Sequence, residues 1–440
     1  MRFCVCRAVC VLKYFMKPVN KKNDTGSTVP NLKMPAQRTE LSESLVSKEF
    51  VLKLFEAFSI QRWNDFIRPI ELNEMDRAGE KMFIAFFIGK AEEKKGHTVN
   101  WHRLIEGCIF ELMRRILLSD IKSPVQRMIR EKFPDEYKKI NEWIFENYAQ
   151  FLRDKEFLDN FSRYLFDTHD SQDISLHILR AAHKYASVRE FEILRIVNAL
   201  DRLGEVETYL NADMESFSDV AGLQDFLNKG KSYRLLIEIE KLRFQERWNQ
   251  SPRIPKTSVL GHSFFVALLS VLISKTLKLP AYRQVNNFFA SLFHDLPEAV
   301  TRDIISPVKR ATNYLPAAIK QIEDIVMAEE LFPLMDEYYL PEIKHYLADE
   351  FENKAFIDGA TVVCAFDELN EKYSEESYKP IDGKLVRVAD HIAAFVEADR
   401  SISYGISSEH LFKGRKSILE KYERAPCING FDVAAFYRQF

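Results

Sequence analysis

The sequence predicts an all-α protein built from two tandem copies of one helical domain. Only 14 of its 440 residues are glycine and 46% are hydrophobic, which favours a compact helical chain over a β-rich or disordered one. Apolar runs that continue all round a helix predict buried core helices. Four sequence matches recur in the same order in the two halves and predict an internal duplication.

Composition and charge exclude several classes of protein. The formal net charge is -3 and there is no basic footprint, so we expect no nucleic-acid partner. Six cysteines, three of them among the first ten residues, leave no even disulfide framework, which predicts a reducing compartment and a cytoplasmic protein. Charged residues interrupt the apolar N-terminal stretch, and the uncharged run between them is too short to span a bilayer. We therefore expect no membrane partner and interpret residues 1–41 as a disordered extension and linker.

The two helical domains are expected over residues 42–225 and 226–440. The repeat interval is about 180 residues, the size of one compact domain. The matching segments begin at Gln61 and Glu246, at Gly79 and Gly261, at Gly107 and Ala290, and at Ile178 and Leu385.

Further helices are expected after the repeated cores. We interpret residues 317–352 as two amphipathic helices split at Pro341, and the stretch from Ala360 to Ser377 as another. A last charged helix is expected from Ser407 onward, with an aromatic tail that docks on the body.

The second copy carries ionisable side chains on its apolar helices. His262 lies in the first turn of a helix expected over 261–277. His294 and Asp295 lie near the end of a second helix expected over 285–300. Such groups are costly to bury without partners, and a divalent metal is the simplest partner for several of them together.

A fourth ligand is expected from farther along the chain. Asp390, in the apolar stretch "LVRVADHIAAFVEA", is the best candidate. This mixed nitrogen and oxygen set suits one divalent ion, Mn, Co, Fe, Ni, Zn or Mg, and the sequence does not choose among them. Glu298, four residues after His294, is expected one helical turn further on the same face.

The four ligands carry a resemblance to a known family. His262, the His294-Asp295 pair and Asp390 resemble the H…HD…D pattern of the HD-domain metal-dependent phosphohydrolases, an all-helical superfamily. The run "HDLPEAVTRDIISPVK" is similar to the 5'-deoxynucleotidase branch of that superfamily. The resemblance covers roughly residues 240–401.

Other residues near the expected ligands have expected roles. Glu298, one turn beyond His294, would hold water or protonate the leaving group, and Asp303 is a second catalytic candidate. The resemblance implies that Arg247 and Lys309 would hold the phosphate and that Trp248 would line the sugar pocket. In the first copy, however, Asp303 and the Arg-Trp pair have counterparts, so a purely structural role stays open for them.

The first copy lacks the metal ligands in this comparison, which makes it a degenerate HD-like domain. The residues that take the places of His262, His294, Asp295 and Asp390 are Glu80, Glu111, Leu112 and His183. Arg115 takes the place of Glu298, so we expect Glu111 and Arg115 to form an internal ion pair that replaces the metal.

The leading functional hypothesis is a metal-dependent phosphomonoesterase that acts on (deoxy)nucleoside 5'-monophosphates. One alternative is an HD hydrolase of nucleoside triphosphates or cyclic nucleotides. The other is a non-catalytic HD-like protein that serves binding or assembly. The expected partner is a small phosphorylated substrate, and a homo-oligomer is left open.

Overall fold

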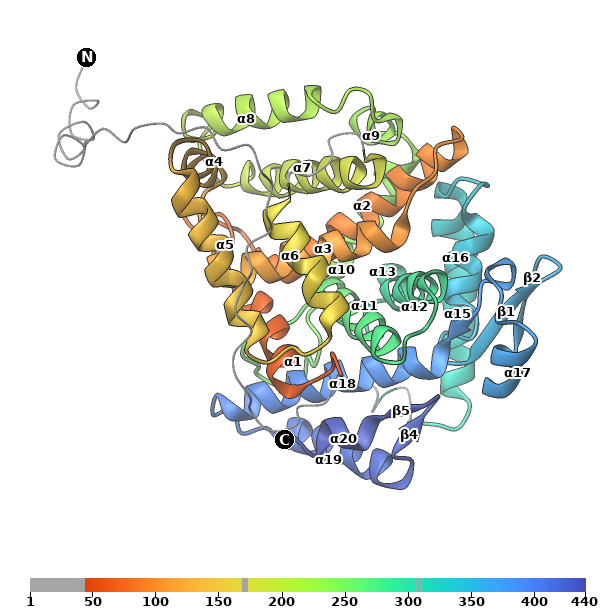
Figure 1. Ribbon diagram of the computed structural model, residues 1–440. Helices are drawn as coiled ribbons and strands as arrows, with labels where there is room; N and C mark the ends of the chain where they lie inside the picture. The colour runs from red at the N-terminus through yellow and green to blue at the C-terminus, as the bar shows by residue number, and fades with distance from the viewer. Residues whose placement is uncertain (1–43, 168–172, 305–307, 309–310) are drawn as a thin grey trace, which may run out of the picture. The chain divides into compact units, whose positions relative to one another are not determined.

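The computed structural model describes residues 44–167, 173–304, 308 and 311–440 (Figure 1). The fold is all-α, as predicted. The described residues, from 44 to 440, belong to one compact unit. The predicted extension over residues 1–41 lies outside the described residues.

Helices make up nearly all of the regular structure. The first part of the chain forms α1 (Lys48–Phe55), α2 (Glu74–Lys94), α3 (Trp101–Leu118), α4 (Ser123–Lys132), α5 (Pro134–Ala149), α6 (Lys155–Phe166), α7 (Ile174–Leu194), α8 (Leu200–Glu215) and α9 (Ala221–Leu227). The second part forms α10 (Lys231–Phe244), α11 (Val259–Thr276), α12 (Ala281–Phe293), α13 (Glu298–Thr301), α15 (Leu315–Val326), α16 (Leu340–Leu347), α17 (Phe366–Glu371), α18 (Gly383–Ser403), α19 (Glu409–Arg424) and α20 (Val433–Tyr437).

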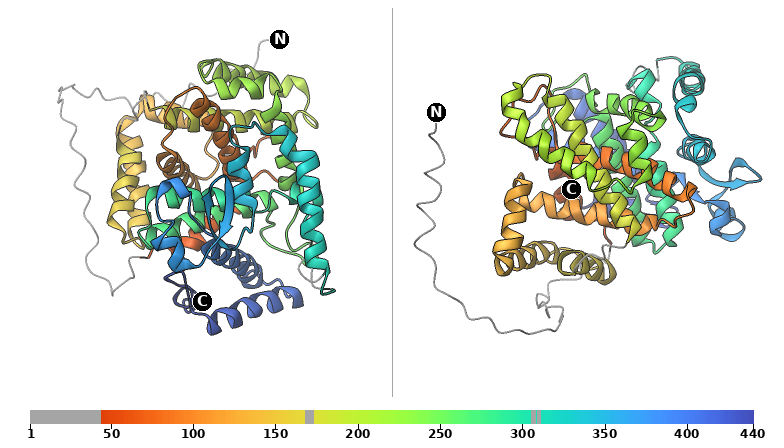
Figure 2. Two further views of the ribbon diagram at one scale, coloured as in Figure 1. Left: turned by 90° about the vertical axis from the view of Figure 1, so that its right-hand side faces the viewer. Right: turned by 90° about the horizontal axis from the view of Figure 1, so that it is seen from above.

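Three short 3₁₀-helices (Glu56–Phe58, Phe332–Leu334 and Glu376–Tyr378), a short π-helix (Met327–Leu331) and five short strands complete the described structure. An antiparallel sheet has the order β2-β1-β3, with β1 at Asn353–Ile357, β2 at Ala360–Val363 and β3 at Ile381–Asp382. A second pair joins β4 (Cys427–Ile428) to β5 (Phe431–Asp432). The helix expected from Ala360 to Ser377 is therefore wrong in its first part, where β2 pairs with β1, and α17 occupies only the middle. The three-stranded sheet lies on the side of the body opposite α4 and α5 (Figures 1 and 2).

Helices α2 and α11 form the centre of the fold and pack against each other. Each starts with a polar N-cap: Asn73 accepts a hydrogen bond from the backbone N–H of Asp76, and Ser258 accepts one from that of Gly261. Helix α11 is buried on all sides, which agrees with the apolar residues on every face of this helix. Within the described residues it is the one helix with the length and composition of a membrane span, and 89% of that span is buried inside the protein.

Two glycines allow α2 and α11 to approach closely. A Cβ on Gly79 would lie 3.1 Å from the Cβ of Phe264, and a Cβ on Gly261 would lie 2.4 Å from Oδ1 of Asp76. A larger side chain at Gly261 would therefore displace the buried side chains of Asp76 and Phe58. His262, the next residue, is thus placed by contact with the N-terminal half of the chain.

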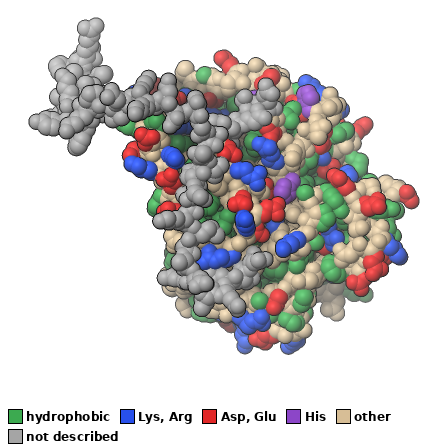
Figure 3. Space-filling view, viewed as in Figure 1, with side chains coloured by type: hydrophobic (Ala, Val, Ile, Leu, Met, Phe, Trp, Pro, Cys, Tyr) green, Lys and Arg blue, Asp and Glu red, His purple; other side chains and the backbone are tan. Residues whose placement is uncertain are grey.

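The surface carries no large patch of one charge among the described side chains visible in Figure 3. Lysine and arginine are interspersed with aspartate and glutamate over this face. This mixture agrees with the small net charge of -3.

Candidate metal centre

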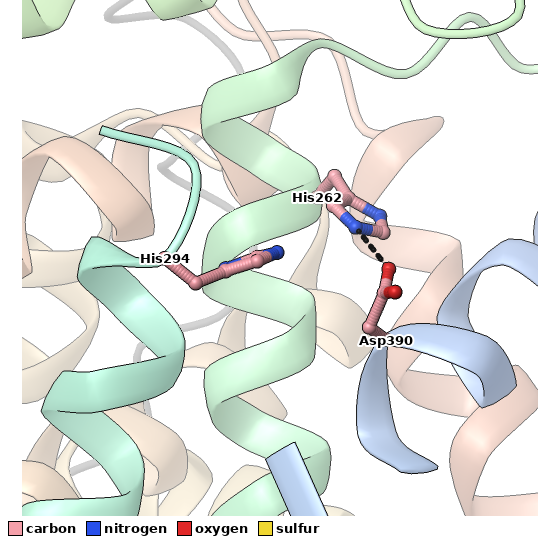
Figure 4. Close-up of side chains that lie close together, drawn as sticks. All are labelled: His262, His294 and Asp390. Atoms are coloured by element: carbon pink, nitrogen blue, oxygen red, sulfur yellow. Dashed lines mark hydrogen bonds and ion pairs between the residues drawn. The ribbon is translucent and has the colours of Figure 1, made fainter. Parts of the chain in front are cut away.

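Three of the four predicted ligands converge on one point (Figure 4). His262 lies in the first turns of α11, His294 caps the C-terminus of α12, and Asp390 lies in the middle of α18. One ligand atom from each lies within 4.8 Å of the others. The Nε2 atom of His262 is 3.1 Å from Oδ1 of Asp390. Three helices that are distant in sequence thus bring together a His, His, Asp set.

The fourth predicted ligand, Asp295, lies at the edge of this cluster. Its Oδ1 atom is 3.2 Å from Nε2 of His294. Its Oδ2 atom is 3.7 Å from Nη1 of Arg247 and has no hydrogen-bond partner among the described residues, although it is buried. A buried carboxylate oxygen that accepts no hydrogen bond is costly, and a metal ion bound directly to it would remove that cost.

The two imidazole rings are oriented so that Nε2 of each faces the cluster. Nδ1 of His262 donates to Oε1 of Glu397 at 3.0 Å, and Nδ1 of His294 donates to the carbonyl of Ser291 at 2.6 Å. Because both acceptors occupy Nδ1, the Nε2 lone pairs remain for a metal. With the carboxylates of Asp295 and Asp390, these donors fit a divalent metal ion.

Glu397 is the functional residue that the sequence comparison missed. Its side chain is fully buried in α18, two turns after Asp390. Oε2 accepts a hydrogen bond from Nε1 of Trp248 at 2.8 Å and lies 3.4 Å from Nε of Arg247. Its seven-residue spacing from Asp390, which places both on one helix face, is the sequence feature that could have revealed it.

The predicted substrate residues Arg247 and Trp248 contact the ligand framework directly. Both donate hydrogen bonds to the carboxylate of Glu397, which also accepts a hydrogen bond from His262. Arg247 also reaches toward Asp295, with Nη1 3.7 Å from its Oδ2 atom. The indole N–H of Trp248 therefore donates to Glu397, whereas Arg247 lies between Glu397 and Asp295.

Burial and charge together set the electrostatics of the centre. Burial, the largest influence, acts to raise the pKa of Asp390, but the hydrogen bond and charge of His262 hold that pKa well below its usual range. Burial and then Arg247 lower the pKa of His262, yet Glu397 and Asp390 raise it above its ordinary value. The pKa of Arg247 is raised because Glu397, Asp295 and other nearby carboxylates outweigh its burial. The centre thus holds anionic carboxylates around two imidazoles.

The structure corrects the helix that was expected to carry Glu298. Helix α12 ends at Phe293 instead of running to residue 300, and a turn follows. In this turn the backbone hydrogen bonds join residues three apart instead of four. The N–H of Glu298, for example, donates to the carbonyl of Asp295 at 3.0 Å. Pro297 provides no N–H to continue the helix. Glu298 therefore begins the separate short helix α13, where its residue is 7% exposed.

The two remaining predicted site residues follow this turn. Asp303 is half-buried, and its carboxylate is among the charges that raise the pKa of Arg247. Lys309 lies outside the described residues.

The N-terminal half repeats the framework around Glu397. Isolated bridges join Gln61 to Asn73 and Glu246 to Ser258, each directly before a central helix. Trp63 has φ 56° and its indole donates to Glu190 at 2.7 Å, as Trp248, with φ 57°, donates to Glu397. Arg62 likewise binds Glu190, with 3.0 Å between its Nε and Oε2.

This matching framework corrects the predicted counterpart of His262. Counted from the N-caps Asn73 and Ser258, the residue four positions into the helix is Arg77 in α2 and His262 in α11. Arg77 also has the contacts expected there, because its Nε is 3.7 Å from Glu190 and its Nη1 is 3.4 Å from Nδ1 of His183. Glu80 instead forms an ion pair with Arg243 of α10 at 2.8 Å. The counterpart of His262 is thus a cation.

Glu111 pairs with Lys81 and His183 instead of with Arg115, the partner that was expected. Glu111 accepts from Nζ of Lys81 at 2.9 Å and lies 2.6 Å from Nδ1 of His183. Burial and the nearby Arg77 lower the pKa of His183 to about 3, so this imidazole is neutral. Lys81 reaches Glu111 from α2, a contact between helices that spacing within α3 cannot reveal.

Comparison with known proteins places the family in the C-terminal half. Residues 239–419 match the family model described as HD domain. This span contains all four predicted ligands and Glu397. No curated protein matches the chain significantly. Residues 239–419 are therefore similar to HD domains, which typically bind a divalent metal and act as metal-dependent hydrolases.

Proposed function

We propose that the protein is a metal-dependent phosphomonoesterase acting on (deoxy)nucleoside 5'-monophosphates. The observation that carries the proposal is the convergence of His262, His294 and Asp390, with both rings held through Nδ1. A structural role alone would not require both Nε2 atoms to face the same carboxylate cluster.

The proposal gives the predicted site residues separate roles in binding the metal, binding the phosphate and transferring a proton. His262, His294, Asp295 and Asp390 would hold one divalent ion. When bound, such an ion activates water and offsets negative charge on a phosphate group. Arg247 would bind a phosphate oxygen beside the ligands, and its 3.7 Å distance from Asp295 and its partial exposure support this role. Proposed roles for Glu298 and Asp303 are to hold water and to move a proton to the leaving oxygen.

The choice of a nucleoside monophosphate rests on sequence resemblance and on charge. The run from His294 to Lys309 resembles that of the 5'-deoxynucleotidase branch. The visible described surface has mixed charge instead of the basic patch that a polyanionic substrate would favour (Figure 3). A small phosphate with one dianionic group suits this setting better than a triphosphate.

A substrate panel tests the proposal directly. The purified chain would be assayed for phosphate release from nucleoside and deoxynucleoside 5'-monophosphates, and in parallel with triphosphates and cyclic nucleotides. We expect monophosphates to be preferred, one tightly held metal ion per chain, and loss of both metal and activity in Asp390→Asn. Preference for triphosphates or cyclic nucleotides would favour the other hydrolase, and metal-free, inactive protein would favour a binding role.

A matched variant in the N-terminal half serves as the control. His183→Asn changes the residue that corresponds to Asp390 without touching a predicted metal ligand. We expect its turnover per folded molecule to stay at the wild-type level. A loss of activity equal to that of Asp390→Asn would contradict the proposed division between the halves.

We further propose that residues 42–225 are a degenerate, metal-free copy of the domain at 226–440. The repeated bridges, the repeated Trp to Glu hydrogen bond and the matching central helices support this duplication. In this copy Arg77 and Lys81 supply positive charge near Glu111 and Glu190, where the other copy would have its metal. The proposal also includes a cytoplasmic protein without membrane or nucleic-acid partners.

A further inference from the structure

The turn after α12 holds three carboxylates of the proposed mechanism but has little regular structure of its own. Asp295 begins the turn, Glu298 starts the short helix α13, and Asp303 follows it. The N–H of Arg302 closes α13 on the carbonyl of Glu298 at 2.9 Å, and Arg302 then adopts a φ of 65°. A single helical turn is too short to hold its own conformation, so contacts from elsewhere must fix it.

One side chain bridges the part of this turn that runs from Glu298 to Asp303. Nε2 of Gln245 donates to the carbonyl of Glu298 at 2.8 Å, and its Oε1 accepts from the backbone N–H of Asp303 at 3.0 Å. A neutral primary amide is both donor and acceptor, which is what this carbonyl and this N–H together require. Gln245 therefore binds the main chain at the two residues whose carboxylates are proposed to move protons.

Gln245 belongs to the segment that positions the rest of the centre. Its own carbonyl accepts from the N–H of Val259, the first residue of α11. Two residues later, Arg247 contacts Glu397 and reaches toward Asp295. One short stretch of chain thus connects the metal-bearing helix, the carboxylate that orients His262, and the turn.

The N-terminal half lacks this connection. Ile60 occupies the corresponding position, because its carbonyl accepts from the N–H of Glu74 at 3.1 Å as that of Gln245 accepts from Val259. An isoleucine side chain has no hydrogen-bonding group. The side-chain bridge is therefore present in the half with the metal ligands and absent from the equivalent position of the other half, in the described residues.

We propose that Gln245 is a positioning residue, which fixes the Glu298 to Asp303 turn relative to the metal ligands. The inference rests on the proposed hydrolase function, since it assigns the turn a part in catalysis. Without the bridge the turn would sample other conformations and its carboxylates would be correctly placed for less of the time. A displacement of about 1 Å at a reacting group can cost roughly 10²-fold in rate.

The test compares Gln245→Leu with Gln126→Leu. Gln126 makes the same kind of bond in the N-terminal half, where its Nε2 donates to the carbonyl of Ile121 at 2.9 Å. Hydrogen exchange measured by mass spectrometry would follow residues 298–303, and metal content, kcat and KM would be measured on the same samples. In Gln245→Leu we expect faster exchange in this segment, unchanged metal content, and kcat lowered by about 10-fold to 10²-fold with KM little changed.

The outcomes separate this inference from the proposed function. Unchanged exchange over residues 298–303, or faster exchange with wild-type kcat, would overturn the positioning role. Loss of metal from Gln245→Leu would also overturn it, because the residue would then support the ligands instead of the turn. A fall in kcat of the same size in Gln126→Leu would show a general folding effect. A wild-type protein without hydrolase activity refutes the proposed function, and the catalytic part of this inference with it.

Discussion

Replacing Glu397 with glutamine tests how the centre is held together. Glu397 is fully buried, and every group that faces its two oxygens is a donor, including the ring of His262 and the indole of Trp248. An amide placed in either orientation would turn one acceptor into a donor facing another donor. The substitution also leaves Arg247 and Arg253, which lie 3.4 and 3.5 Å from Oε2, without their buried counter-charge.

The structure sets the expected size of both effects. Partners that orient a metal-binding histidine typically contribute about 10-fold to 100-fold to metal affinity, which corresponds to about 1.4–2.7 kcal/mol. Removing one partner from a buried ion pair costs about 3–5 kcal/mol of folding stability. We therefore expect Glu397→Gln to bind metal about 10-fold to 100-fold more weakly and to unfold at lower denaturant concentration.

Glu190→Gln is the matched control for this experiment. Glu190 receives the same kinds of donors from Arg62 and Trp63, but it orients no metal ligand. It should lose similar stability while metal affinity, measured by competition with a chelator of known affinity, stays at the wild-type value. Wild-type metal affinity in folded Glu397→Gln, or an equal loss of affinity in both variants, would refute the reasoning.

Three further predictions concern the catalytic carboxylate, the N-terminal ion pair and pH. Glu298→Gln should keep its metal and lose about 10²-fold or more in hydrolysis, whereas Asp295→Ala should lose metal and activity together, as elemental analysis beside a phosphate-release assay would show. Lys81→Met should destabilise the fold by up to about 3–5 kcal/mol in a denaturant titration, because Lys81 is the buried partner of Glu111. The metal content of Lys81→Met should not change. A denaturation midpoint equal to that of the wild type would contradict the pairing of Lys81 with Glu111. Burial raises the pKa of Asp76 from 3.8 to about 6, so the folded state binds this proton more tightly. Binding of this proton contributes about 3 kcal/mol to the stability of the folded state. This contribution is present in full below pH 3.8 and is lost as pH rises through about 6. Asp76→Asn cannot titrate, so its stability relative to wild type should rise over that range, and a constant difference would refute the assignment.

Much of the metal centre could be predicted from the sequence. His262 and the His294-Asp295 pair stood out because ionisable groups on apolar helices need partners, and Asp390 because it lies in an apolar helix of its own. The all-α fold followed from composition and from helical periodicity. These inferences depend on local patterns, which the linear sequence contains in full.

The errors arose where a local pattern fits more than one register. Matching Gly79 with Gly261 paired Glu80 with His262, whereas the N-caps and bridges pair Arg77 with it. The two alignments differ by three residues, nearly one helical turn, so the apolar face of the helix looks much the same in both. The contacts of Arg77 with Glu190 and His183, together with the N-caps and bridges, distinguish them.

Tertiary structure alone decided which side chains meet. Glu111 could have paired with Arg115 by spacing along α3, but Lys81 approaches from α2 and is the closer partner. Gln245 carries no motif, and Glu397 has only its seven-residue spacing from Asp390. Their partners are set when α10, α13 and α18 pack around the first turns of α11. Sequence therefore determined which residues are expensive to bury, because that cost belongs to each side chain. Their partners were decided by the packing of helices far apart in the chain, which no local pattern records.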